Sequence, residues 1–273
     1  GAAKDLCLCG YIFTKDAALA FDQEWRAMLG RHGLPYFHMK ECAHAAGVFS
    51  GLGHDGCDKA AREAIDIIKR HASQGVALSV DKSVGAALRK ASPWMDEYSF
   101  IVGQVFFAIR DWAKANQPGA SVSCLFENGD SGTGMAVDAA RRILKTPGFQ
   151  EDCRVSMFTW AENNQETPLQ AADMLAWHLN LWLRKRRAGV AAKRLDFKSL
   201  LGVPTVYHHW DRSSVDALAA IRSGWKGMAG TSSPRSRRDL STANAQHGFI
   251  GVAPSYPQTV ECAPLAGNHD TPG

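Results

Sequence analysis

Strand-like and helix-like segments alternate along most of this chain, and the alternation is the feature that most limits its fold. Segment 6–13 is apolar on both faces, as a central strand is, and segment 16–29 has the spacing of an amphipathic helix. The alternation continues with helices at 57–73, 93–115, 134–144 and 167–187 and strands at 76–80, 122–127 and 155–160. This pattern predicts an α/β fold, in which helices cover both faces of a mixed or parallel sheet.

The composition agrees with a chain that buries a core. Of 273 residues, 45% are hydrophobic and 21% are charged, which excludes a wholly disordered chain and a disulfide-stapled miniprotein. No apolar stretch approaches the roughly 20 residues that a membrane-spanning helix needs. We expect one α/β domain over 1–229, with its core at about 6–187, and a disordered tail over 230–273, where prolines gather without periodicity.

Charge and cysteine content set weaker limits. The formal net charge is +4, which permits a polyanionic partner without requiring one. The seven cysteines are an odd number and no secretory leader is visible, so we expect free thiols in a reducing cytoplasm. Oligomeric state is not indicated by the sequence.

Two acidic side chains follow the strand predicted at 122–127. Glu127 is placed where the strand ends, and Asp130 lies in the turn after it. Carboxylates at the carboxyl edge of a sheet face the position where α/β proteins bind ligands, and their oxygens suit a hard divalent cation. A solvated strand end and an Asx turn are the structural alternatives.

A third carboxylate, Asp173, lies inside an apolar, alanine-rich helical segment. Thr167, Pro168 and Gln170 predict a helix start with a capping box, which gives Gln170 a structural role. Asp173 lies beyond the first turn, and a carboxylate buried there is costly unless it is paired or bound to a metal. We therefore weigh a metal or active-site role for Asp173 against a salt bridge.

Three segments together resemble a known family. They are Phe37-His38-Met39-Lys40, Leu125 to Asp130 (LFENGD) and Leu169 to Ala176 (LQAADMLA), in this order and spacing. Over roughly 6–187 the chain resembles the bacterial and phage family called domain of unknown function 3800, which implies a ribonuclease-H-like fold. By this resemblance, Glu127 and Asp173 are metal ligands and catalytic residues, and His38 lies near the same cleft.

The resemblance implies a function and also shows a departure. It implies a nuclease or phosphodiesterase that uses Mg²⁺ or Mn²⁺, with His38 moving protons, although His38 also suits a structural role. The family opens with a strand carrying Asp-Glu-Ser-Gly, and residues 1–6 contain only Asp5. We expect either missing upstream residues or a degenerate copy, so the alternative is a catalytically inactive nucleic-acid-binding or scaffold domain.

A basic run supports a nucleic-acid partner, DNA or RNA. Arg184, Lys185, Arg186 and Arg187 end the helix that carries Asp173, and such a run can contact phosphates without reading sequence. Cations are also favoured at a helix C-terminus without any ligand.

Two other patterns are weaker. Cys42, His44, His54 and Cys57 have the ligand types of a zinc site, but their spacing departs from that of known zinc motifs. Residues 51–56 match GxGxxG, but no full strand precedes them, so a glycine-rich loop is favoured over a dinucleotide site.

Overall fold

The computed structural model describes residues 5–91, 95–128, 133–145, 154–190, 192–215 and 247–255. In the last of these ranges, and at 91, 133–137 and 139, only the backbone is described. Within these ranges, no helix is both long and apolar enough to cross a membrane.

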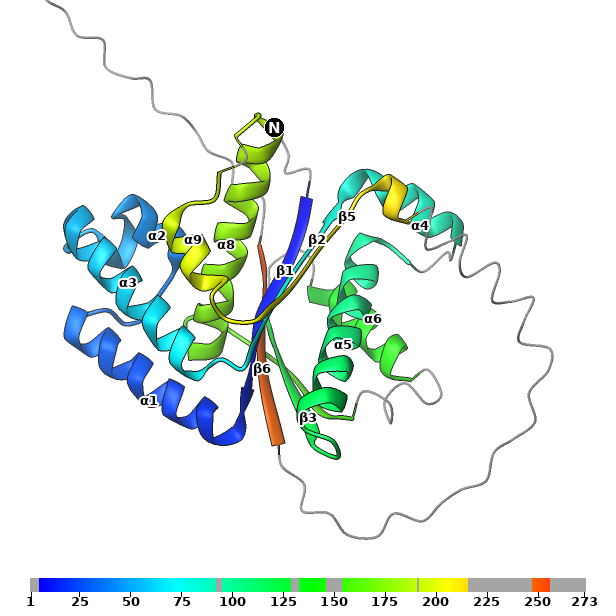
Figure 1. Ribbon diagram of the computed structural model, residues 1–273, viewed down its shortest axis with the longest axis horizontal. Helices are drawn as coiled ribbons and strands as arrows, with labels where there is room; N and C mark the ends of the chain where they lie inside the picture. Colours follow the sequence, from blue (N-terminus) through cyan, green and yellow to red (C-terminus); the bar gives the residue numbers. More distant parts are fainter. Residues whose placement is uncertain are drawn as a thin grey trace, which may run out of the picture.

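The fold is α/β, built on one mixed sheet of six strands in the order β4-β3-β6-β1-β2-β5 (Figure 1). The strands are β1 (Asp5–Thr14), β2 (Gln74–Asp81), β3 (Ser121–Glu127), β4 (Val155–Ala161), β5 (Thr205–Trp210) and β6 (His247–Ser255). β1 is antiparallel to both of its neighbours, β2 and β6. β3 is parallel to β6 and to β4, and β5 is parallel to β2.

Helices cover both faces of this sheet (Figure 1). On one face lie α1 (Lys15–His32), α2 (Met39–His44), α3 (Gly53–His71), α8 (Thr167–Arg187) and α9 (Leu195–Leu200). On the other lie α4 (Gly85–Ala91), α5 (Glu97–Asn116) and α6 (Thr133–Leu144). Two short 3₁₀ turns, η1 (Gly47–Phe49) and η2 (Lys82–Val84), complete the described elements.

β1 divides the hydrophobic core in two. Its side chains alternate: Cys9 and Tyr11 pack under α1, α3 and α8, whereas Leu8 and Ile12 pack under α5. All four are fully buried. The apolar stretch at 6–13 is therefore a central strand, as its sequence predicts.

The predicted alternation of elements is confirmed from β1 to α8, with boundaries that shift by a few residues. Four short elements, α2, α4, α9 and β5, were not predicted from the sequence; the three helices have only six or seven residues, fewer than two full turns, which is too short to show a helical period. Residues 247–255, which the sequence analysis includes in a disordered tail, form β6 inside the sheet. The rest of the proposed tail, 230–246 and 256–273, lies outside the described residues.

An ion cluster ties the end of α8 to the start of the sheet. The guanidinium of Arg187 binds both carboxylate oxygens of Asp5, which is buried, and also donates to Asp81 Oδ2 at 3.1 Å. The charge of Arg187 is thus balanced by two carboxylates, and the nucleic-acid contact that the sequence predicts for it stays a prediction. The cluster also holds Asp5 at the opposite end of α8 from Asp173. Arg187 follows Asp173 by fourteen residues, which corresponds to about 21 Å along the helix axis.

We predict that Arg187→Met lowers the free energy of unfolding by about 3 kcal/mol, because it leaves the buried Asp5 carboxylate without its cation. Urea denaturation measures this change. Arg184→Met, an exposed neighbour on the same helix, should change stability by less than about 0.5 kcal/mol. Equal effects of the two substitutions would contradict a structural role for the ion cluster.

Candidate active site

Gln170, in the first turn of α8, fixes the chain that leads into α2. Its side-chain oxygen accepts hydrogen bonds from Trp25 Nε1 and from the backbone N–H of Phe37, both at 2.8 Å. The predicted capping box is wrong, because Thr167 is already helical and its hydroxyl donates to Asp22 Oδ1 at 2.8 Å. Gln170 instead connects α8, α1 and the segment before α2.

Asp173 lies one turn further along α8 and faces the same segment. Its Oδ2 accepts a hydrogen bond from the backbone N–H of Met39 at 2.9 Å, and His38 Nε2 lies 4.0 Å from its Oδ1. The side chain is only 16% exposed. Burial raises the pKa of Asp173, the charge of His38 and the Met39 N–H oppose the rise, and the charge of Glu41 adds to it.

Glu127 reaches the same place from the sheet. Val122, Cys124 and Phe126 pack on the α5 side of β3, so the side chain of Glu127 lies on the α8 side. Burial and then the charge of Asp173 raise the pKa of Glu127 to about 8, against a hydrogen bond from Asn163 that lowers it. The structure thus brings together the two carboxylates that the sequence singles out.

Two residues that act on this pair, Glu41 and Asn163, were not predicted from the sequence. Glu41 accepts hydrogen bonds from Val48 N at 3.2 Å and from the Tyr36 hydroxyl, and it lies 3.3 Å from His38 Nδ1. The position of Glu41, three residues after His38 at the start of α2, was the available signal. Asn163 lies in the turn before α8, where no motif marks it.

Of the three predicted acidic ligands, the described residues bring together two, Glu127 and Asp173. Among the described residues, no group of three or more His, Cys, Asp or Glu side chains is arranged to hold a metal ion. Asp130, the third predicted ligand, lies outside the described residues. Asp5 cannot replace it, because the ion cluster with Arg187 holds it at the other end of α8.

The weaker patterns of the sequence do not form sites in the described structure. Cys42 and Cys57 are buried, and Cys42 Sγ contacts Cys57 O at 3.4 Å, whereas His44 and His54 are exposed, so these four do not converge on one ion. Residues 53–56 of the GxGxxG segment already form the first turn of α3, and the element before the segment is the short turn η1 rather than the strand that a dinucleotide fold requires.

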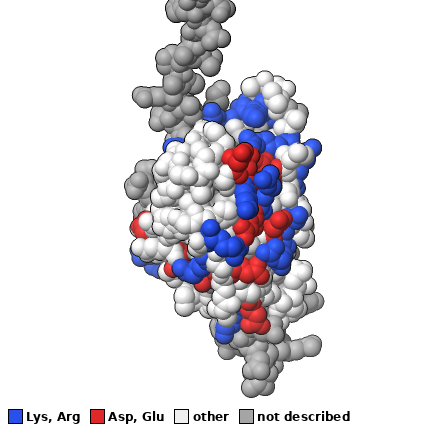
Figure 2. Space-filling model, turned by 90° about the vertical axis from the view of Figure 1, so that its left-hand side faces the viewer, with Lys and Arg blue, Asp and Glu red and all other residues white. Residues whose placement is uncertain are grey.

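The surface over the helical layer carries charges of both signs. Figure 2 shows basic and acidic side chains interspersed on this face rather than one continuous basic field. All four residues of the basic run in α8 are exposed, and the Arg186 guanidinium lies over the Trp182 ring at 5.5 Å.

Comparison with known proteins gives no match: no family model, no curated protein and no solved structure is significantly similar to the chain.

We predict that Gln170→Ala destabilises the fold by about 3 kcal/mol, because the buried donors of Trp25 and Phe37 lose their acceptor. Thermal or urea unfolding tests this. Gln165→Ala, an exposed position just before α8, is the matched control and should leave stability within about 0.5 kcal/mol. A Gln170 variant as stable as the control would contradict the connecting role.

We also predict a pH dependence that belongs to Glu127. Its pKa of about 8 in the folded chain exceeds the ordinary carboxyl value of 4.5, so the folded state holds the proton more tightly than the unfolded state. Stability in the presence of a chelator should therefore fall, by about 1–3 kcal/mol, as pH rises from about 4.5 to 8.

Glu127→Gln should remove this fall, whereas Asp66→Asn, at an exposed position on α3, should retain it. Urea denaturation at a series of pH values measures both. A wild-type profile that Glu127→Gln leaves unchanged would show that Glu127 titrates normally.

Proposed function

We propose that this protein is a divalent-metal-dependent nuclease, a phosphodiester hydrolase acting on DNA or RNA. The observation that carries the proposal is the half-buried pair of Glu127 and Asp173, whose pKa values burial raises, the charge of Asp173 adding to the rise at Glu127. Two carboxylates held together in this way repel each other when ionised, and a cation between them relieves the repulsion.

The donor set suits a hard divalent ion. Carboxylate oxygens are the ligands that Mg²⁺ and Mn²⁺ prefer, and Glu127 and Asp173 are the residues that would hold the ion. When bound, such an ion supplies a nucleophilic water and balances the charge that develops on a scissile phosphate. Met39 N–H fixes one oxygen of Asp173, which orients the carboxylate before any ligand binds.

The surrounding residues hold His38 for proton transfer. Glu41 lies 3.3 Å from His38 Nδ1, and His38 Nε2 faces Asp173. In the proposed reaction, Nε2 exchanges a proton with water or with the leaving oxygen, while Glu41 orients the ring. Gln170 supports both groups by holding Phe37, the residue before His38, in place.

The order and directions of the strands support a ribonuclease-H-like arrangement. Five neighbouring strands are compared with a ribonuclease-H-like sheet: β2, β1, β6, β3 and β4. Their order and directions agree with that sheet when β6 takes the position of its opening strand. This places β6 directly beside β3, the strand that ends in Glu127. The resemblance to domain of unknown function 3800 implies an acidic motif at this place in the sheet.

The same strand favours a second candidate function. Residues 247–255 contain no Asp or Glu, so β6 contributes no carboxylate next to Glu127. A fold that keeps two of three acids is the expected state of a catalytically inactive nucleic-acid-binding or scaffold domain. Measuring metal binding and cleavage separately distinguishes this candidate from the nuclease.

We predict saturable binding of Mn²⁺ by isothermal titration calorimetry, with an affinity that increases as pH rises toward 8, because the ion displaces the proton of Glu127. Glu127→Gln and Asp173→Asn should each weaken binding by more than about tenfold, whereas Asp66→Asn should not.

Cleavage is assayed on labelled single- and double-stranded DNA and RNA with Mg²⁺ or Mn²⁺. The same two variants should reduce cleavage by about a hundredfold or more. Metal binding without cleavage of any substrate would favour the inactive domain, and the absence of metal binding would contradict the nuclease proposal.

A further inference from the structure

Cations and aromatic rings cover the C-terminal end of α8, and we call this region the basic aromatic surface. It consists of Trp182, Arg184, Lys185 and Arg186 of α8, Lys193 from the segment after it and Tyr207 of β5. Tyr207 lies on an edge strand of the sheet and is 39% exposed. Segment 184–198 holds seven Lys or Arg residues and a single acid, Asp196. This end of the helix is therefore far more basic than the chain as a whole, whose net charge is +4.

The two rings are held in fixed positions against the fold. The Trp182 ring packs on the buried ring of Phe197, with centroids 6.2 Å apart, and meets the Tyr207 ring edge to face at 5.7 Å. Arg186 and Lys193 lie over the Trp182 ring at 5.5 and 4.9 Å, distances at which cation–π attraction holds them beside the rings. The surface therefore presents an exposed tyrosine ring with cations already placed around it.

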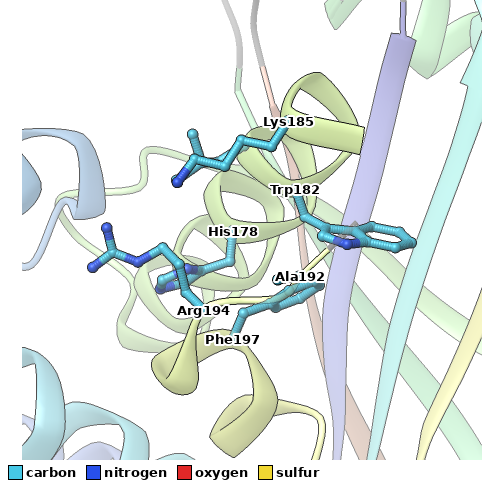
Figure 3. Close-up of a pocket in the computed structure, with 7 residues that line it drawn as sticks. His178, Trp182, Lys185, Ala192, Arg194 and Phe197 are labelled. Carbon is cyan, nitrogen blue, oxygen red and sulfur yellow. The ribbon is translucent and has the colours of Figure 1, made fainter. Parts of the chain in front are cut away.

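The interior behind this surface is closed. His178 is 2% exposed, its ring nitrogens are buried, and its ring is stacked on Phe197 with the planes 6° apart. Figure 3 shows the Trp182 ring pointing toward the strands, whereas the Lys185 and Arg194 side chains point away from them. The charge thus extends around the end of α8, and a partner contacts the surface from outside.

The acids near this surface are already paired. Arg187 binds Asp5 and Asp81, and Asp196 Oδ2 lies 2.9 Å from Arg194 Nη2. Among the described residues, the four cations of the basic aromatic surface have no carboxylate within ion-pair distance. Their charges are therefore available to an anionic partner.

The helix C-terminus alone does not account for so many cations. It carries about half an elementary negative charge, which four unpaired cations exceed. On α1 and α3, by contrast, Arg26, Arg31 and Arg70 each bind a carboxylate. Trp182 follows Asp173 by nine residues, about 14 Å along the helix axis, so salt screens the surface from the acid pair. Charge complementarity therefore points to a polyanion.

The aromatic rings define the form of that polyanion. In a duplex the bases stack on one another, and proteins hold the backbone with cations alone. Proteins that bind single strands combine a basic surface with aromatic rings on which the unpaired bases stack. Tyr207 supplies an exposed ring, and the planar Arg186 guanidinium beside it is a second group on which bases stack.

We propose that the basic aromatic surface binds single-stranded nucleic acid. Arg184, Lys185, Arg186 and Lys193 hold backbone phosphates, and the Tyr207 ring stacks on a base. The inference rests on the proposed function, because it names the form of nucleic acid that the proposed nuclease acts on. It concerns side chains other than Glu127 and Asp173, so it can be tested without metal.

The test measures binding in the absence of cleavage. The full chain is titrated into a fluorescein-labelled single-stranded oligonucleotide of about 16 nucleotides in EDTA, and fluorescence anisotropy is read at several NaCl concentrations. We expect saturable binding that weakens with salt. The slope of log K against log [NaCl] should be about −3, the value for four phosphate contacts on a single strand.

Tyr207→Thr tests the ring. Threonine suits an edge strand but removes the stacking face, so the affinity should fall by about fivefold or more, whereas Tyr207→Phe should bind as the wild type does. Arg186→Gln combined with Lys193→Gln should make the salt slope shallower by about 1.4. Lys59→Gln combined with Arg62→Gln removes the same charge from exposed positions on α3 and should leave the slope unchanged.

A duplex of the same sequence and vesicles of phosphatidylcholine with phosphatidylserine are the competing partners. Weaker binding of the duplex than of the single strand, at equal phosphate concentration, supports the proposal. Equal binding of the two, an unchanged affinity in Tyr207→Thr, or binding to vesicles alone would overturn it.

Failure of this inference is distinguishable from failure of the nuclease proposal. Single-strand binding in EDTA by a chain that does not bind Mn²⁺ supports the surface and contradicts the nuclease. Mn²⁺ binding at Glu127 and Asp173 without binding of any oligonucleotide overturns the surface alone.

Discussion

The close packing of α8 on the sheet is the constraint on which the rest of the structure depends. Ala171, Ala172 and Ala176 are fully buried, and their small side chains let the helix axis approach β1 and β6 closely. Because the helix is held in this way, the positions of its polar residues are fixed relative to the sheet. Asp173 and Glu127 are close together for this reason and not because of any attraction between them.

α8 also separates its polar residues by function along its length. Gln170 anchors the segment before α2 near one end, and Arg187 joins the strand ends at the other. Asp173 and His178 lie between these two anchors. Because both ends of α8 are anchored, the helix keeps the Asp173 carboxylate and the His178 imidazole at low exposure. Neither of these two side chains would stabilise its own burial.

The sequence predicts the long elements and the acid pair, but not the contacts that support the pair. Hydrophobic spacing is sufficient for β1 and α8, and the position of Glu127 at the end of β3 follows from the strand itself. Gln170 shows the limit: a local capping motif was the natural interpretation, but its partners, Trp25 and Phe37, are more than 130 residues away along the chain. Local patterns do not encode such distant pairings, and the same holds for His178 and for β6.

The position of β6 has a consequence for how the chain is made. β1 and β3 each carry one edge that only β6 covers in this sheet, and β6 comes from residues 247–255. During synthesis, the segments up to α8 emerge first, so these two inner edges have no partner strand until residues 247–255 have been translated. Unpaired edges of this kind attract other strands. A ribosome that stalled before residue 247 would therefore release a sheet open at its centre.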